Sequence, residues 1–227
     1  LKGKHFDGVM NYRIGWSSLC WVACNKLKSS YKNPLYPLES LEGEAFVKVL
    51  NTTFAWYPPE VNSCQMNLLD SHDVPRSLHT LRGDIPALKL ALFLLFIQPG
   101  SPCIYYGTEA ALSGGKEPEC RECFPWDELW NEDLRSFIRS LSAFRRENIA
   151  TFGLALEWKS IGKNCIVGRA PQKESKHSRK KKIVAFLNRG RRSWLPINET
   201  FCEPIFCVGN LELGDRGLGP QSATLLA

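Results

Sequence analysis

The sequence has no apolar run long enough to cross a membrane. Its longest such run, Leu90–Ile97, is followed at once by Gln98, Pro99 and Gly100, whereas a membrane-spanning helix needs roughly 20 apolar residues. We therefore expect this run to form a buried helix. Disordered and collagen-like compositions are also excluded, because 44% of the 227 residues are apolar and 23% are charged, as in ordinary globular proteins.

An initiator methionine, an apolar leader and a cleavage signal are absent from the first residues as well. On this ground we expect either a processed chain or a fragment. A disulfide framework is not expected either, because the nine cysteines are odd in number and scattered over the chain, which is typical of free thiols in a reducing compartment. The sequence therefore predicts a cytoplasmic protein.

The sequence offers little for a metal site. Cys120-x-x-Cys123 has no second cysteine or histidine pair at zinc-finger spacing. His72-Asp73 could belong to the metal-binding dyad of a phosphohydrolase, but such a site needs further histidine and aspartate ligands, and the other three of the four histidines are scattered. No metal and no cofactor are predicted in this chain.

Most of the positive charge is local. The formal net charge is +6, and the run Lys173–Lys182 holds six basic residues against one glutamate. Because this run contains no aromatic residues and the rest of the chain is nearly neutral, a solvated loop insertion is favoured over a nucleic-acid patch. We expect neither a nucleic acid nor a membrane as a partner.

In the first part of the chain, short apolar runs alternate with helical patterns, which is typical of βα units. Asp84 is a predicted N-cap with Pro86 in the first helical turn, and the last of these helices has one apolar face. The predicted strands are Phe6–Tyr12, Met66–Leu69 and Cys103–Tyr106, and the predicted helices are Ser17–Leu27, Leu41–Leu50, Ile85–Ile97 and Asn131–Arg146.

After Ala150 the pattern changes to short β-rich runs separated by polar turns, which predicts a small antiparallel sandwich. We therefore expect an α/β fold in two domains, residues 1–150 and residues 151–227. Three parallel strands alone would leave an unpaired sheet edge, so the first part of the fold is expected to be missing. The strands predicted in the second domain are Leu154–Trp158, Cys165–Gly168, Ile183–Leu187, Ser193–Ile197, Pro204–Val208 and Ala223–Leu226.

Polar side chains follow the predicted strands, at the ends where the loops of a β/α barrel build its active site. Ser71-His72-Asp73 is the strongest candidate, because two titratable side chains directly follow an apolar run and Arg76 comes one short turn later. A carboxylate there could accept hydrogen bonds from sugar hydroxyls and stabilise developing positive charge. A helix N-cap or a solvated loop stays open as the alternative. The strand ends carry Asn11, Tyr12, His72, Asp73 and Glu109.

Four motifs carry a family resemblance. They read FDGVMNY at Phe6–Tyr12, NLLDSHDVPR at Asn67–Arg76, GSPCIYYGTE at Gly100–Glu109 and GGKEPECR at Gly114–Arg121, with Trp126-Asp127 following. In this order they resemble the second half of an enzyme of the α-amylase family, glycoside hydrolase family 13, in the cyclomaltodextrinase, neopullulanase and maltogenic amylase subgroup. The resemblance implies the last three βα units of a (β/α)8 TIM barrel, followed by an all-β C-terminal sandwich domain.

The resemblance also implies an activity, that of a retaining glycosidase acting on α-1,4 or α-1,6 glucosidic bonds. Asp73 matches the family's transition-state stabiliser, and His72 matches the neighbour that hydrogen-bonds the same hydroxyls. Glu117 and Arg121 match the charged pair that holds the next glucose, and Arg76 is predicted to bind substrate as well. The implied partner is an α-glucan oligosaccharide or a cyclodextrin, and a homodimer of the full-length parent is a further expectation.

Two catalytic motifs of the family are not found in the sequence, namely the Gly-x-Arg-x-Asp of the nucleophile and the segment with the general acid/base glutamate. The chain is therefore expected to open just after the acid/base residue. Retaining hydrolysis needs two carboxyl groups about 5 Å apart, so we expect this chain alone to hydrolyse nothing. Calcium binding in the missing half stays open. A glucosyl-transferring relative and a non-catalytic, amylase-like glucan-binding protein are the alternatives.

Overall fold

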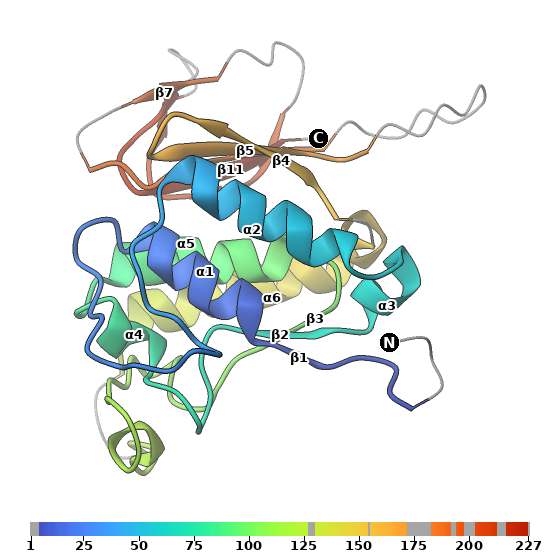
Figure 1. The fold of residues 1–227 in the computed structure, drawn as a ribbon. Helices are drawn as coiled ribbons and strands as arrows, with labels where there is room; N and C mark the ends of the chain where they lie inside the picture. The colour runs from blue at the N-terminus through green and yellow to red at the C-terminus, as the bar shows by residue number, and fades with distance from the viewer. Residues whose placement is uncertain are drawn as a thin grey trace.

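The computed structural model describes residues 5–126, 130–153, 155–171, 183–191, 194–197, 203–212 and 217–226. Figure 1 shows three layers, a small parallel sheet, a layer of helices and an antiparallel sheet. The predicted loop at Lys173–Lys182 lies outside the described residues, and so does Asp127. Within the described ranges, no helix combines the length and the apolar character that a membrane span requires.

The parallel sheet consists of three short strands, β1 (Met10–Asn11), β2 (Met66–Leu68) and β3 (Ser101–Cys103). β2 lies in the centre and pairs in parallel with both neighbours. The strand order in the sheet is therefore the order in the chain, and the connections between the strands run through helices. This arrangement places the carboxyl ends of all three strands along one edge of the sheet.

Two of the predicted strands differ from the observed ones. The prediction of a strand at Cys103–Tyr106 is wrong in position, because the chain leaves the ladder after Cys103 and the next two tyrosine rings pack against the Arg76 guanidinium. The first strand is shorter than predicted and stops at Asn11. The Asn11 side chain accepts the Ile14 N–H at 3.4 Å and caps the following helix.

Helices cover the parallel sheet and separate it from the antiparallel one (Figure 1). They are α1 (Tyr12–Val22), α2 (Gly43–Ala55), α3 (Pro59–Ser63), α4 (Ser77–Thr80), α5 (Ile85–Ile97) and α6 (Glu132–Glu147), with 3-10 turns η1 (Glu119–Arg121) and η2 (Ile149–Phe152). The buried helix predicted after Asp84 is confirmed as α5. The helix predicted at Ser17–Leu27 begins earlier, because the Asn11 cap starts α1 directly after β1.

The C-terminal region is antiparallel. The larger sheet has the order β4 (Glu157–Ile161), β5 (Cys165–Arg169), β6 (Val184–Asn188), β11 (Ser222–Leu226) and β8 (Pro204–Val208), and the smaller one has β7 (Leu195–Pro196), β10 (Gly217–Leu218) and β9 (Leu211–Glu212). Each strand predicted here overlaps an observed one, although Leu154 and Ser193 lie outside the described residues. β9 and β10 are missing from the prediction, because each is two residues long and lies in the glycine-rich segment Gly209–Gly219, whose composition favours turns.

Asp84 ties the helical layer to the C-terminal region. Its carboxylate lies 2.7 Å from Arg191 Nη2, 3.4 Å from Lys26 Nζ and 3.2 Å from Gln221 Nε2, and it accepts the Ala87 N–H at 3.2 Å as the cap of α5. Burial by itself would raise the pKa of Asp84, but these four partners outweigh burial and lower that pKa below its usual value.

Asp84→Asn is expected to lower the free energy of unfolding by about 1 kcal/mol at pH 7, because asparagine keeps the capping acceptor but loses the charge. A carboxyl group whose pKa is lower in the folded state stabilises the protein above its unfolded pKa, and this stabilisation is lost as the pH falls through the folded pKa. Urea denaturation of both proteins should give a difference that is full at pH 7 and shrinks below about pH 4. A difference that does not change with pH would contradict the ionic role.

Candidate active site

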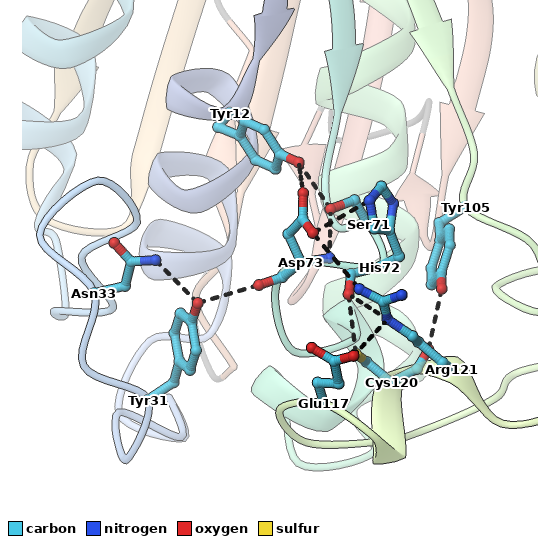
Figure 2. Close-up of polar contacts among 10 residues, drawn as sticks. All are labelled: Tyr12, Tyr31, Asn33, Ser71, His72, Asp73, Tyr105, Glu117, Cys120 and Arg121. Carbon is cyan, nitrogen blue, oxygen red and sulfur yellow. Dashed lines mark hydrogen bonds and ion pairs between the residues drawn. The ribbon is translucent and has the colours of Figure 1, made fainter.

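The loops that follow the three parallel strands meet at one edge of the sheet (Figure 2). Tyr12 directly follows β1, residues 71–73 follow β2, and Glu117 and Arg121 lie on the longer loop after β3. α/β proteins build their active and ligand-binding sites from polar groups at the carboxyl ends of parallel strands. The sheet therefore brings together side chains that are far apart in the sequence.

The loop after β2 presents Asp73 towards solvent. At its start the buried Asp70 carboxylate accepts the Ser77 N–H from the first turn of α4. Burial raises the pKa of Asp70, while the hydrogen bonds from Ser77 and the charge of Arg76 oppose that rise. Closer to the tip, Ser71 Oγ accepts the Asp73 N–H at 3.1 Å. Two bonds from side chains to the backbone thus fix the shape of this loop.

The Asp73 carboxylate is surrounded by hydrogen-bond donors. His72 Nε2 lies 3.2 Å and Arg121 Nη2 lies 3.8 Å from Asp73 Oδ1, and the Tyr12 hydroxyl donates to Oδ2 at 3.5 Å. The carboxylate nevertheless keeps 57% of its side chain exposed, so a ligand reaches its oxygens without displacing protein atoms. A charged acceptor among donors is suited to a ligand rich in hydroxyl groups.

The Tyr12 hydroxyl lies between Ser71 and Asp73, and it is 2.8 Å from Ser71 Oγ. Burial raises the pKa of Tyr12, the hydrogen bond with Ser71 lowers it in part, and the negative charge of Asp73 raises it further. The phenol therefore stays protonated at neutral pH and remains a donor to the carboxylate. Its ring meets the buried Tyr36 ring edge to face, at 6.0 Å between centroids.

The backbone at His72 and Asp73 is held from two sides. Arg121 Nε donates to the His72 carbonyl oxygen at 3.1 Å, and the Cys120 thiol donates to the same oxygen at 3.4 Å. From the loop between α1 and α2, the Tyr31 hydroxyl donates to the Asp73 carbonyl oxygen at 3.2 Å. The position of the Asp73 side chain thus depends on three loops (Figure 2).

Glu117 and Arg121 form an exposed pair beside Asp73. Glu117 Oε1 lies 3.5 Å from Arg121 Nε, and the two side chains are 66% and 43% exposed. A pair this open to solvent contributes little to stability. Both groups keep hydrogen-bonding atoms directed to solvent, so together they offer a donor and an acceptor to a bound hydroxyl.

Arg76 lies beneath this surface and is only 1% exposed. Its Nη1 donates to the Tyr106 carbonyl oxygen at 2.6 Å, and its guanidinium carbon lies 4.7 Å and 4.8 Å from the ring centroids of Tyr105 and Tyr106. The backbone N–H of Arg76 donates to the Gly114 carbonyl oxygen at 3.0 Å. Arg76 therefore links the loops after β2 and β3. A direct contact with substrate stays a prediction, and the observed geometry favours a positioning role.

The structure brings together most of the residues that the sequence predicts for the site, namely Asp73, His72, Glu117 and Arg121. Asn11, at the end of β1, points inward instead and donates to Asn67 Oδ1 at 3.0 Å. Glu109, at the end of the third predicted strand, has a buried Oε2 without a hydrogen-bond partner among the described residues. The functional roles assigned to all of these residues remain predictions.

The sequence prediction does not include Tyr31 and Cys120. Tyr31 lies in a turn-rich segment with no periodic pattern, and neither the GGKEPECR motif nor the lone Cys-x-x-Cys that contain Cys120 indicates a contact with the His72 backbone. A metal site is not evident in the part of the chain that the structure describes, where no three histidine, cysteine, aspartate or glutamate side chains are grouped to hold an ion. The predicted absence of metal and cofactor remains an expectation.

Parallel strands that alternate with helices, with polar side chains at their carboxyl edge, are the arrangement that defines the class of β/α proteins. Comparison with family models narrows this class, since the model "Alpha amylase, catalytic domain" matches residues 1–205. The chain belongs to the α-amylase family, glycoside hydrolase family 13. The resemblance drawn from its four motifs is thereby confirmed.

Similar proteins include a cyclomaltodextrinase from Geobacillus thermopakistaniensis (strain MAS1), 36% identical over 148 residues, which are 65% of this chain and 23% of that protein. An intracellular maltogenic amylase from Bacillus subtilis (strain 168) is 38% identical over 163 residues, 71% of this chain and 25% of that protein. The solved structure of ligand-free cyclic α-maltosyl-(1→6)-maltose hydrolase from Arthrobacter globiformis is 25% identical, with a TM-score of 0.76 over 100% of this chain and 46% of that chain.

The chain thus spans about a quarter of the length of these curated relatives. Over the part that they cover, the predicted likeness to the cyclomaltodextrinase and maltogenic amylase subgroup is confirmed. The fold is amylase-like, in agreement with the solved relative.

Proposed function

We propose that this site binds the glucose rings of an α-glucan and supplies one of the acids of a retaining glycoside hydrolase. The observation that carries the proposal is the exposed Asp73 carboxylate, with His72, Arg121 and Tyr12 as donors around it. Sugar hydroxyls both donate and accept hydrogen bonds, so they match an acceptor placed among donors. Membership of the α-amylase family supports the choice of substrate class.

In this proposal Asp73 acts mainly in the transition state. Glycosidic cleavage passes through an oxocarbenium-like state, and a fixed carboxylate beside the ring stabilises the positive charge that develops there. The Tyr12 hydroxyl contacts both Ser71 Oγ and the Asp73 carboxylate and so positions the carboxylate. These side chains need not move when the positive charge develops on the sugar ring. His72 binds hydroxyls of the same ring.

Glu117 and Arg121 form the neighbouring part of the proposed site and hold the next glucose. Their exposed donor and acceptor atoms support this role. The substrate that we propose is a cyclodextrin or an α-glucan oligosaccharide with α-1,4 or α-1,6 bonds, as the names cyclomaltodextrinase and maltogenic amylase of the relatives suggest. Homodimerisation of a longer protein belongs to the same proposal.

The proposal includes a domain division. Residues 1–150 would form the last three βα units of a (β/α)8 barrel, and residues 151–227 would form a β-sandwich. The parallel order of β1, β2 and β3 supports the first assignment, and the two antiparallel sheets support the second. Among the described residues, the outer strands of the parallel sheet each have one unpaired edge, which is open to pairing with another strand. In a closed barrel, further strands would pair with these edges.

Since the 227 residues contain neither the nucleophile motif nor the acid/base motif of the family, we propose that residues 1–227 bind α-glucan without cleaving it.

Calorimetric titration of residues 1–227 with maltotriose should give a dissociation constant on the order of 1 mM, and incubation of the chain with maltotriose should release no glucose. Arg121→Ala should weaken binding about tenfold, because it removes a charged donor between Asp73 and Glu117.

Arg146→Ala is the matched control, since Arg146 is exposed in the last turn of α6 and outside the site. It should bind maltotriose as the unchanged chain does, and urea unfolding should show that both variants are folded. Failure of the unchanged chain to bind would reject the sugar site. Steady glucose release would reject the idea that further acids are needed, and unchanged affinity in Arg121→Ala would count against Arg121.

A further inference from the structure

A cavity with no assigned role lies beside the candidate active site. Its volume is about 330 Å³, and three segments form it, residues 28–31, 75–79 and 115–119. It shares Tyr31 with the contacts of Asp73, but neither Asp73 nor Arg121 lines it. The proposed glucan site therefore does not account for this cavity.

The cavity has an excess of positively charged lining groups. Lys28 and Lys116 reach it from two different segments, and in the described part of the chain no carboxylate lies within ion-pair distance of either ammonium group. His79 adds a third basic side chain. Burial and the charge of Lys28 lower the pKa of His79, although Glu119 raises it in part, so at neutral pH the ring is an uncharged N–H donor.

The cavity wall also carries one carboxylate, that of Glu119, so the two lysines leave a net positive charge. Glu119 Oε2 accepts the Gly115 N–H at 2.8 Å, which turns the carboxylate onto its own loop. The loop packs tightly here, because a Cβ at position 115 would lie only 2.6 Å from that oxygen and 3.4 Å from His79 Nε2. The two lysines are thus left with unused donors at a space that is open to a ligand.

We propose that this cavity binds a phosphate-type oxyanion, either inorganic phosphate or the phosphoryl group of a sugar phosphate. Two ammonium groups supply compact positive charge, and Ser30 and His79, which also line the cavity, can supply an uncharged O–H and N–H donor. Such charge-assisted hydrogen bonds are the ones that oxyanions form most strongly in proteins. The volume lies near the lower end of small-molecule sites, which leaves room for a phosphoryl group with a sugar attached.

Occupation of the cavity would connect the loops that build the candidate active site. Tyr31 lines the cavity and also donates to the Asp73 carbonyl oxygen. Lys116 precedes Glu117 directly, and η1, which ends at Arg121, begins at the cavity-lining Glu119. An anion held between these segments would therefore change the affinity for glucan, and by linkage glucan would change the affinity for the anion by the same factor.

The test is calorimetric titration of residues 1–227 with inorganic phosphate and, separately, with glucose 1-phosphate, at constant ionic strength so that general screening does not change. We expect saturable binding of at least one of the two. Lys28→Ala and Lys116→Ala should each weaken it about tenfold or more, since each removes a charged hydrogen-bond donor. Lys48→Ala, an exposed lysine of α2 outside the cavity, is the matched control and should bind as the unchanged chain does.

Each outcome decides the proposal. Tighter binding of glucose 1-phosphate than of phosphate supports a sugar phosphate as the ligand, and the reverse supports the free anion. Absence of saturable binding of both up to about 50 mM, or equal loss in Lys48→Ala, overturns the proposal, provided that urea unfolding shows folded proteins. Anion binding needs no glucan hydrolysis, so this proposal and the proposed function fail independently.

Discussion

Asp73→Asn is expected to lower turnover of maltotriose by about a thousandfold or more in any longer form of this polypeptide that hydrolyses it. Asparagine has nearly the same size and keeps one carbonyl acceptor, but it loses the charge that stabilises an oxocarbenium-like transition state. The Tyr12 hydroxyl and the Asp73 backbone contacts can hold the amide in place. The loss should therefore appear in kcat, measured by glucose release, far more than in KM.

A matched control for this experiment is Glu44→Gln. Glu44 is exposed in the first turn of α2, outside the site. Its substitution makes the same change from acid to amide as Asp73→Asn, so turnover should stay at the parent level. The role assigned to Asp73 would be rejected if Asp73→Asn kept turnover within about tenfold of the parent. Equal losses in both variants would point to general damage rather than to the chemistry of one carboxylate.

Arg189→Ala is expected to lower the free energy of unfolding by about 3 kcal/mol or more. Arg189 is 4% exposed, and its guanidinium donates to the Trp21 carbonyl oxygen, to the Leu41 carbonyl oxygen at 2.6 Å and to Asn164 Oδ1 at 3.1 Å. These bonds join the C-terminal region to α1 and to the segment before α2. Alanine would remove the guanidinium donors from the Trp21 and Leu41 carbonyl oxygens, and it would also create a void against the Trp21 ring.

Urea denaturation with two further variants separates the contributions. Arg189→Lys should recover only part of the loss, because one ammonium group cannot replace a planar guanidinium that donates in several directions. Arg139→Ala, on the exposed side of α6, should change the free energy of unfolding by no more than about 0.5 kcal/mol. If Arg189→Ala behaved like Arg139→Ala, the connection between the two regions would have to rest on other contacts.

The elements predicted correctly are those that short stretches of sequence specify. Asp84 and Asn131 each accept an N–H three residues ahead, at Ala87 and at Leu134, so the starts of α5 and α6 follow from local hydrogen bonding. Strand ends were harder to predict, because pairing with a distant strand decides them. The apolar run that begins at Cys103 resembles a strand, yet the ladder with β2 ends at Cys103 itself.

The residues of the candidate site likewise divide into those that a short motif indicates and those that only contacts between distant segments reveal. Asp73 and His72 are adjacent in a motif, so the sequence indicates them directly, and the loop motif with Glu117 and Arg121 is equally compact. Arg76 belongs to the first motif, but its side chain turns under the neighbouring loop and packs against two tyrosine rings. No local pattern predicts that turn, because the rings come from a loop after a different strand.

By itself, the sequence determined the family, the order of α/β and β-rich regions and the carboxylate at position 73, because motifs and helix caps depend on residues that are close together in the chain. Only the tertiary structure decided that Tyr31 would reach the Asp73 backbone, that Arg76 would be buried and that Lys28 and Lys116 would line one cavity. Contacts between distant segments depend on how three parallel strands align their ends and how the following loops pack, and these distances are not encoded in any short stretch of residues.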